Sequence, residues 1–291
     1  MRPSPGRRWA RAPGKLVLLG EYAVLDGAGA VVAAVDRGVQ CRVEPADTLR
    51  IETPGDDRFV RAALEGAPAA RYRFEDWNPV DLPSKPGFGG SAAATVAAVL
   101  AAGRPGVDAF AVHHAVQGGG SGVDVHASLH GGVSRFPSPT PLSAPAGLEG
   151  WPLVAVWSGE SAATGPRVRQ YLAWPGREAF VARSAELLDL FPQEPLRALR
   201  EAWPLLRAMA AGAGILYATD ALVRIVALAE ALGGAAKPSG AGGGDVAVAL
   251  FPDPETRARF EAACAAEGLP TIAVRVVGPA TSGAGELDAG E

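Results

Sequence analysis

The chain has 291 residues, of which 48% are hydrophobic and 20% charged, a composition typical of a globular protein rather than a disordered one. Its length favours one large domain or two modest ones. The net charge of −4 argues against a nucleic-acid-binding protein, and no apolar run is long enough for a transmembrane helix. Two cysteines are too few for a disulfide framework or a cysteine-based zinc site. The basic N-terminus lacks the apolar core of a secretory signal, so we expect a cytoplasmic protein.

Apolar runs and glycines divide the first half of the chain into expected elements. Buried strands are expected at 15–19, 31–35, 39–43 and 71–74, the second and third as a hairpin joined at 36–38. Helices are expected at 91–103, 108–117 and 121–130. Ser91 is the expected N-cap of the first helix, and Gly103 its end. The proline-rich segment 137–146 is expected to be a linker or an exposed crossing.

The second half alternates strands with helices. Strands are expected at 153–157, 245–251 and 271–277. Helices are expected at 166–174, 177–190, 195–211, 217–232 and 254–267. This order predicts an α+β half packed beside an α+β first half, with domains at 1–148 and 149–280. Residues 281–291 are small and polar and are predicted to form a disordered tail.

Only three of the 27 basic residues are lysines, and each lies beside a glycine-rich segment. They are Lys15 in APGK, Lys85 in SKPGFGGS and Lys237 in AKPSGAGGGD. A compact ammonium group fits a crowded phosphate where a planar guanidinium does not. The pattern therefore points to phosphate chemistry.

The segment 85–92 places glycines directly before an expected helix. Glycines let the backbone approach an anion, and the first-turn N–H groups and the helix dipole favour phosphate there. The segment is not a P-loop, because GxxxxGK[ST] does not occur in the chain. A dinucleotide-binding loop is disfavoured, since Pro83 and Pro86 would interrupt the strand that must precede it. The alternative is an ordinary helix-entry loop.

Two further segments carry candidate functional residues. Residues 237–245 are rich in glycine and precede an apolar strand, which favours a ligand-facing turn over a flexible linker. Asp124 lies one turn into an expected helix, either as a partner of the helix N-terminus or as a base or charge partner in a cleft. His126 and His130 are four residues apart and could share a helix face. With Asp124 they could form a metal site; the alternative is that they are ordinary histidines on a helix surface.

Together these motifs resemble those of the GHMP kinase family. The matching segments are APGKLVLLGEYAVLDG at 12–27, KPGFGGSAA at 85–93, GSGVDVHASLHGG at 120–132 and KPSGAGGGD at 237–245. The resemblance implies a two-domain α+β GHMP kinase fold, with a β-rich, ATP-binding N-terminal domain and a ferredoxin-like C-terminal domain. ATP would lie between the two domains.

Within the family, three stretches are most similar to the phosphomevalonate kinases. They are Gly20-Glu21-Tyr22, QGGGSGVDV at 117–125 and WSGESAAT at 157–164. The resemblance then implies ATP-dependent phosphorylation of 5-phosphomevalonate to 5-diphosphomevalonate, in the mevalonate route to isoprenoids. Mevalonate kinase or another small-molecule GHMP kinase is the alternative, and a non-catalytic ligand sensor on the same fold is a third.

The resemblance also assigns roles to individual residues. Lys15 and Asp124 match the catalytic pair. The ATP phosphates would contact the second motif, at Lys85, Gly87, Phe88, Gly89, Gly90, Ser91 and Ala92, with Ser91 also binding Mg²⁺. The acceptor would contact Glu21, Tyr22, Ser121, Gly122, Ser161, Ala162, Thr164, Ser239 and Gly240. The expected partners are ATP, Mg²⁺ and 5-phosphomevalonate, without nucleic acid or membrane, and the protein is expected to be a monomer or a homodimer.

Two departures from the family pattern concern the metal. Gly90 stands where the second motif commonly has a serine, and an ungapped alignment places His113 where mevalonate kinases hold a Mg²⁺-ligating glutamate. The protein ligands of Mg²⁺ therefore stay open. So does the arginine that would bind the acceptor phosphate, for which Arg37, Arg135, Arg167 and Arg169 are candidates by position.

Overall fold

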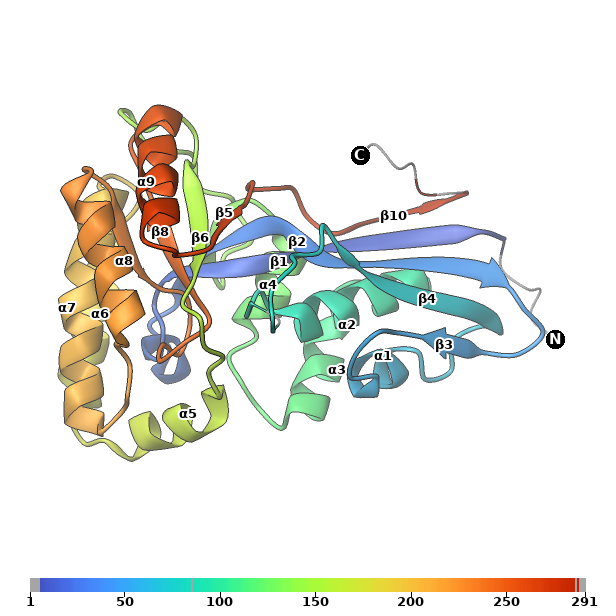
Figure 1. The fold of residues 1–291 in the computed structure, drawn as a ribbon. Coiled ribbons are helices and arrows are strands. Elements are labelled where there is room, and N and C mark those ends of the chain that lie inside the picture. The colour runs from blue at the N-terminus through green and yellow to red at the C-terminus, as the bar shows by residue number, and fades with distance from the viewer. Residues whose placement is uncertain (1–5, 85, 286, 288–291) are drawn as a thin grey trace.

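Two β-sheets organise the chain, one in each half (Figure 1). The computed structural model describes residues 6–84, 86–285 and 287. The first sheet has the strand order β10-β1-β2-β4-β3, with β5 paired to β2. Its strands are β1 (Arg8–Leu19), β2 (Ala30–Pro45), β3 (Arg50–Glu52), β4 (Ala70–Trp77), β5 (Val133–Phe136) and β10 (Thr281–Ala284). The β3–β4 pair is parallel and the other pairs are antiparallel.

Four helices cover one face of this first sheet (Figure 1). They are α1 (Arg58–Ala63), α2 (Gly90–Ala101), α3 (Asp108–Gln117) and α4 (Val123–His130). Helix α2 packs on β1 and β2 and is built mainly from alanine and valine, most of them fully buried. Small side chains let the helix approach the sheet closely, which fixes the position of its N-terminus.

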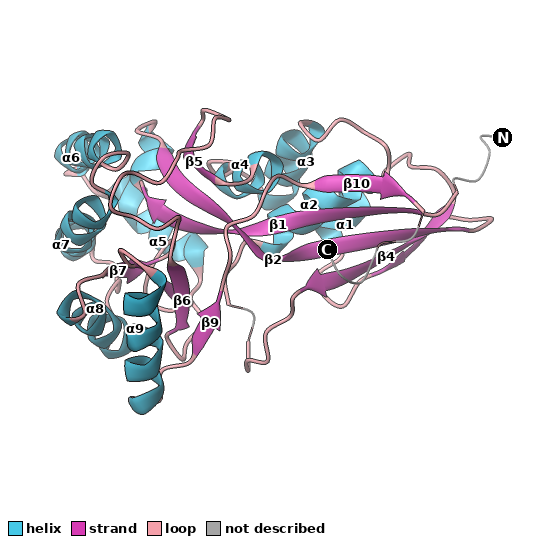
Figure 2. Ribbon diagram, turned by 90° about the horizontal axis from the view of Figure 1, so that it is seen from above, coloured by secondary structure: helices cyan, strands magenta, loops and turns pink. Residues whose placement is uncertain are grey.

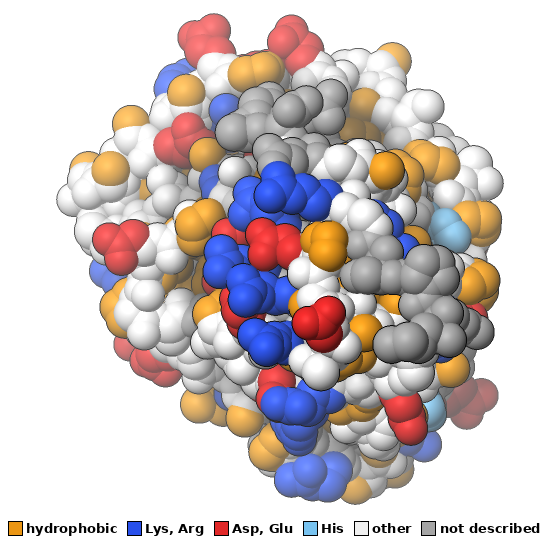
Figure 3. Space-filling model, turned by 90° about the vertical axis from the view of Figure 1, so that its right-hand side faces the viewer, with side chains coloured by type: hydrophobic (Ala, Val, Ile, Leu, Met, Phe, Trp, Pro, Cys, Tyr) orange, Lys and Arg blue, Asp and Glu red, His pale blue; other side chains and the backbone are white. Residues whose placement is uncertain are grey.

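Charged side chains line the other face of the same sheet. Arg71 and Arg73 of β4 reach Glu52 of β3 at 3.4 and 3.0 Å, and Arg42 pairs with Glu75. Figure 3 shows arginine and acidic side chains gathered at this end of the molecule. Alternation of buried and charged residues along β4 is typical of an antiparallel sheet with one solvated face.

The second sheet is antiparallel and has the strand order β7-β8-β6-β9. Its strands are β6 (Leu153–Trp157), β7 (Ala235–Pro238), β8 (Val246–Leu250) and β9 (Thr271–Ala273). The helices of this half are α5 (Thr164–Ala173), α6 (Arg177–Leu190), α7 (Pro195–Ala213), α8 (Asp220–Ala231) and α9 (Pro254–Ala266), and a short 3₁₀ helix, η1, covers Ala23–Asp26. None of the helices in the described part of the chain has the length and apolar character to cross a membrane.

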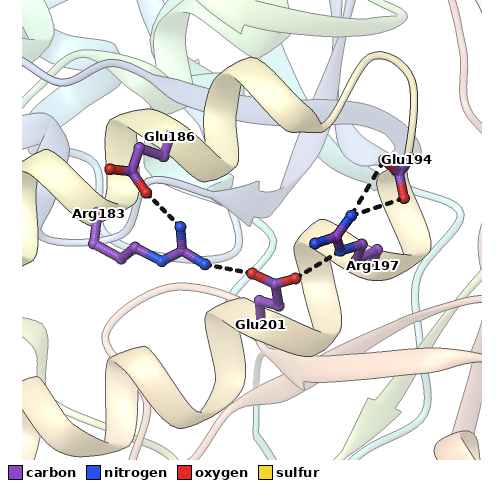
Figure 4. Close-up of polar contacts among 5 residues, drawn as sticks. All are labelled: Arg183, Glu186, Glu194, Arg197 and Glu201. Atoms are coloured by element: carbon purple, nitrogen blue, oxygen red, sulfur yellow. Dashed lines mark hydrogen bonds and ion pairs between the residues drawn. The ribbon is translucent and has the colours of Figure 1, made fainter.

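Helices α6 and α7 bury apolar side chains and carry ion pairs on their outer side (Figure 4). Arg183 pairs with Glu186 of its own helix and with Glu201 of α7. Arg197 reaches Glu201 at 2.8 Å and Glu194 at 3.4 Å. Because all of these groups are well exposed, each pair contributes little to stability.

Strand β2 is continuous, so the predicted hairpin at 31–35 and 39–43 is wrong. Gly38 does not make a turn; it lies against β1, where a Cβ would clash with the Ala12 carbonyl. Asp36 fixes the strand at this point, because its carboxylate accepts hydrogen bonds from the Arg275 backbone and side chain, both at 2.9 Å. The glycine therefore serves close strand packing rather than a reversal.

The predicted disordered tail is also wrong for its first residues. Residues 281–284 form β10, which pairs with β1 and places Gly283 opposite Trp9. The strand returns the C-terminal segment to the N-terminal sheet, beyond the predicted domain boundary at 280. Residues 286 and 288–291 of the predicted tail lie outside the described residues.

A single large cluster of buried side chains crosses from one half to the other. It joins Leu18 of β1 and Val35 of β2 to Val156 of β6, Phe191 after α6 and Val248 of β8. Figure 2 shows β1 and β2 extending from the first sheet toward the helices of the second half. The two sheets are thus held in a fixed relation, and loops from both meet beside β1.

Candidate active site

A cleft of about 780 Å³ lies between β4, the N-terminus of α2 and loops of the second half. Phe59, Phe74 and Trp77 contribute aromatic side chains to its walls, while Ser91 and Asp245 contribute polar ones. Its volume lies within the usual range for small-molecule and cofactor sites, about 300–1,000 Å³. The cleft therefore suits a ligand with a flat apolar part and a polar part.

The second motif forms the loop that leads into α2. Gly87 and Gly89 adopt left-handed conformations, with φ of 50° and 74°, and Gly89 is the N-cap of the helix. A Cβ on Gly89 would lie only 3.1 Å from Lys15 Cγ, so a glycine is needed there. Ser91 lies within the first turn, not at the predicted N-cap. The first-turn N–H groups have no partners within the helix, which makes this end of the cleft suitable for a phosphate.

Lys15 lies between this loop and Asp124. Its backbone N–H donates to the Phe88 carbonyl at 2.8 Å, and its Nζ donates to the Gly87 carbonyl at 3.1 Å. The same Nζ is 3.9 Å from Asp124 Oδ1. Lys15 is buried, so a compact cation is held against the glycine loop before α2, and the predicted catalytic pair lies close together.

Asp124 lies in the first turn of α4, two residues after the left-handed Gly122. Its neighbours Val123 and Val125 are buried and fix the helix against the sheet, while 38% of the Asp124 side chain stays exposed. Ser121 contributes a hydroxyl that accepts the Val123 N–H at 3.4 Å. The carboxylate is thus held by a rigid helix and remains accessible to a ligand.

Ser91 is hydrogen-bonded to His113, at 3.2 Å between Oγ and Nε2. His113 is buried and stacks on Phe59, with ring centroids 5.1 Å apart. Burial lowers the pKa of His113, which favours the neutral imidazole. The residue that replaces the expected glutamate therefore orients the Ser91 hydroxyl rather than supplying a carboxylate.

The glycine-rich motif at 237–245 begins in β7, where Lys237 is fully buried against Glu21. Lys237 Nζ also donates to the Pro238 carbonyl at 2.8 Å and the Val17 carbonyl at 3.3 Å. Burial lowers the pKa of Lys237, and the neighbouring Glu21 opposes that shift. The phosphate interpretation of the lysines thus fits Lys15 but not Lys237, which joins β7 to β1. Lys85 lies outside the described residues.

Several predicted acceptor contacts join the motif at 12–27 to the motif at 237–245. Ser239 Oγ accepts the Val17 N–H at 2.8 Å, Tyr22 OH donates to the Ala241 carbonyl at 2.6 Å, and the Gly240 N–H lies 3.5 Å from Glu21 Oε1. Glu21, Tyr22 and Ser239 are buried. As acceptor contacts they stay predictions, because the structure shows them holding the glycine loop 240–244 against β1.

The predicted segment 161–164 forms one wall of the cleft. Ser161 and Ala162 line it, and Thr164 begins α5 as an exposed residue. The Ala162 N–H donates to Asp245 Oδ1 at 3.3 Å. Sequence reasoning missed Asp245 as a site residue; the signal was an acidic side chain at the end of a glycine run, directly before a buried strand.

The histidines of α4 have a structural role. His126 is buried, lies 3.2 Å from Ser134 Oγ and packs edge-on against Phe136. Within the described residues, no three metal-ligating side chains form a cluster. These contacts account for the buried position of His126 without the metal site that its spacing to His130 suggested.

Fold and site together define an α+β protein of two halves, with a glycine-rich loop suited to a phosphate at their junction. Residues 187–269 match the family model described as GHMP kinases C terminal. This match and the fold together show the GHMP kinase fold, so the fold expected from the sequence is confirmed.

Curated relatives place the similarity within one part of the family. The chain is 28% identical to the phosphomevalonate kinase of Streptomyces sp. (strain CL190), over 82% of this chain and 88% of the relative. It is 31% identical to the mevalonate kinase of Methanothermobacter thermautotrophicus, over 43% of this chain and 48% of the relative. The second match thus spans about half the length of that kinase. The similarity is to the mevalonate kinase and phosphomevalonate kinase type.

A solved structure shows the same fold over nearly the whole chain. Streptococcus pneumoniae phosphomevalonate kinase in complex with phosphomevalonate and AMPPNP superposes with a TM-score of 0.76 at 19% identity. The match covers 92% of this chain and 99% of that one.

Proposed function

We propose that the protein transfers the γ-phosphoryl group of ATP to the phosphate of 5-phosphomevalonate. The observation that carries this proposal is the position of Lys15, whose ammonium lies between the Gly87 carbonyl and the Asp124 carboxylate. The relative matched over most of the chain is a phosphomevalonate kinase, which supports this acceptor.

Phosphoryl transfer depends on positioning and charge stabilisation more than on covalent help from the protein. The first turn of α2 would bind the nucleotide phosphates through its free N–H groups. Lys15 would neutralise charge on the transferred group and on the acceptor oxygen. Mg²⁺ prefers oxygen ligands. Such oxygens lie around the loop before α2, on Ser91, Asp124 and Asp245. When bound with the nucleotide, Mg²⁺ would offset the phosphate charge.

The role of Asp124 depends on the acceptor. A phosphate oxygen of 5-phosphomevalonate is already ionised near neutral pH, so Asp124 would orient Lys15 or the acceptor. A neutral alcohol, as in mevalonate, would require Asp124 as a base. The 3.9 Å separation from Lys15 Nζ is long for a charge-assisted hydrogen bond and leaves room for either arrangement.

Of the candidate arginines, we assign the acceptor phosphate to Arg167, at the start of α5. Arg135 pairs with Asp189 at 2.7 Å, so its charge is already partnered. Arg37 donates to the Asn78 and Ala273 carbonyls at another part of the cleft. Arg167 donates to the carbonyls of residues 163, 216 and 243. These neutral partners hold the guanidinium against the glycine loop without cancelling its charge, which leaves it suited to an anionic group.

The proposal is tested by following ADP release with Mg-ATP across an acceptor panel of 5-phosphomevalonate, mevalonate, homoserine and galactose. Turnover confined to 5-phosphomevalonate is the expected result. Turnover confined to mevalonate would replace the proposal with the alternative, a mevalonate kinase, which the 31% identity to an archaeal mevalonate kinase favours. Nucleotide binding without turnover on any acceptor would overturn both.

A further inference from the structure

Asp245 ends the motif at 237–245 and lines the cleft beside the loop that precedes α2. A Cβ on Gly87 would lie 3.2 Å from Asp245 Oδ2, so the carboxylate packs directly on the phosphate-binding loop. The carbonyl of the same Gly87 accepts the hydrogen bond from Lys15 Nζ. An acidic side chain and the candidate catalytic cation thus meet at one glycine.

The backbone holds this carboxylate in place. The Asp245 N–H donates to the Glu160 carbonyl at 2.7 Å, and its carbonyl accepts the Ser158 N–H at 2.9 Å. Oδ1 accepts the Ala162 N–H at 3.3 Å, which leaves Oδ2 toward Gly87. Burial raises the pKa of Asp245, while the hydrogen bond from the Ala162 N–H and the charges of Lys15 and Arg167 oppose the shift.

A carboxylate beside a phosphate-binding loop repels the nucleotide unless a cation lies between them. Mg²⁺ in such sites is commonly held by one or two protein oxygens together with the phosphates. Ser91 lines the same cleft as Asp245 and offers a second oxygen. We propose that Asp245 is a protein ligand of the divalent cation that accompanies the nucleotide, with the Ser91 hydroxyl as its companion. This inference rests on the proposed function only in that the cleft binds an adenine nucleotide.

Asp245→Asn tests the inference, because asparagine keeps an oxygen for the Ala162 N–H and tolerates the left-handed φ of 55°. The probe is the ATP analogue AMPPNP, titrated calorimetrically with Mg²⁺ and with EDTA. Wild-type protein is expected to bind it more tightly with Mg²⁺. In the variant, the increase in AMPPNP affinity caused by Mg²⁺ is expected to be smaller by at least about tenfold. Metal-free AMPPNP is expected to bind the variant more tightly than it binds wild type.

Asp56→Asn is the matched control, since Asp56 lines the same cleft but pairs with Arg58 at 2.6 Å. Its gain from Mg²⁺ is expected to equal that of wild type. An equal gain in Asp245→Asn would overturn the inference and leave Asp245 as an anchor for residues 158–162. If Asp245→Asn does not fold, Asp245→Ser decides instead, because it also removes the charge. The titration contains no acceptor, so its result does not depend on whether 5-phosphomevalonate is the correct acceptor. Failure of the wild-type protein to bind AMPPNP would overturn the proposed function as well.

Discussion

At the scale of single residues, Lys15 carries the largest expected effect on the reaction. Lys15→Met removes the ammonium that contacts Gly87 and approaches Asp124, so the proposed phosphoryl transfer would lose the cation that neutralises the transferred group. We expect kcat to fall more than about 100-fold, roughly 2.7 kcal/mol of transition-state stabilisation. Steady-state kinetics with the acceptor identified by the panel measures this, with thermal melting to verify folding. A folded variant with near-normal kcat would exclude Lys15 as the catalytic cation.

Arg167 is expected to act on binding of the acceptor rather than on the nucleotide. Arg167→Gln removes a charge-assisted contact, commonly about 1.5–3 kcal/mol, so the KM for 5-phosphomevalonate should rise about 10–100-fold. The KM for ATP should stay near the wild-type value. Arg169→Gln, on an exposed arginine two residues further along α5, is the control. Equal effects of the two variants would argue for a general charge effect and against the assignment.

At the scale of secondary structure elements, the sequence predicted best where a pattern was local. The apolar run of β6 and the helix of residues 177–190 have the bounds that their patterns indicated. Strand β10 was missed, since its glycine and small polar side chains give no pattern and its pairing with β1 is decided by tertiary packing. Strand β7 was missed for a related reason: Lys237 and Pro238 resemble loop residues, and only the partner Glu21 explains a buried lysine.

In the candidate site, too, local features were predicted from the sequence and long-range contacts were not. The glycine motif at 85–92 predicted the loop before α2, because its conformation suits a phosphate. The pairing of Lys15 with Asp124 came from the family resemblance. The contacts of Glu21 and Asp245 depend on residues more than eighty positions away, at Lys237 and Ala162. Spacing within a motif carries no information about such partners.

The buried Lys237–Glu21 pair ties β7 to β1, and its loss should affect stability strongly. Lys237→Met leaves the Glu21 carboxylate buried without its cation, so we expect the free energy of unfolding to fall by about 3–5 kcal/mol. Adding Glu21→Gln to that variant should restore much of the loss, because the stranded charge is then removed. Arg183→Met, which breaks exposed pairs between α6 and α7, should cost about 1 kcal/mol or less. Urea denaturation of the four proteins tests this, and similar costs for the two single variants would contradict it.

Where α4 packs on β5, His126 should make stability depend on pH. Burial lowers the pKa of His126 from 6.5 to about 4, with a smaller contribution from His130. The unfolded chain therefore binds a proton first as the pH falls, so stability should decline between about pH 6.5 and 4. The full shift corresponds to about 3 kcal/mol. Urea denaturation across this range should show a shallower decline for His126→Gln than for wild type, while His114→Gln, at an exposed histidine, keeps the wild-type slope.

At the scale of the whole molecule, the two halves are expected to unfold together. Their shared core joins β1 and β2 to the second sheet, so neither half can bury all of its apolar side chains alone. Two further connections cross the boundary: Arg275 bonds to Asp36 of β2, and β10 pairs with β1. Since β10 follows the second half in sequence, the first sheet is complete only when the chain has folded through both halves.

This coupling predicts one cooperative transition rather than two. Differential scanning calorimetry should give a single peak whose van't Hoff and calorimetric enthalpies agree. AMPPNP with Mg²⁺ should shift the whole peak upward, because a ligand that contacts α2 and the 161–162 loop binds only when both halves are folded. The fragment 1–148 is the matched comparison and should show no cooperative melting, since it lacks β10 and the second sheet. Two resolved peaks, or a nucleotide shift confined to one of them, would show that the halves are independent despite their common core.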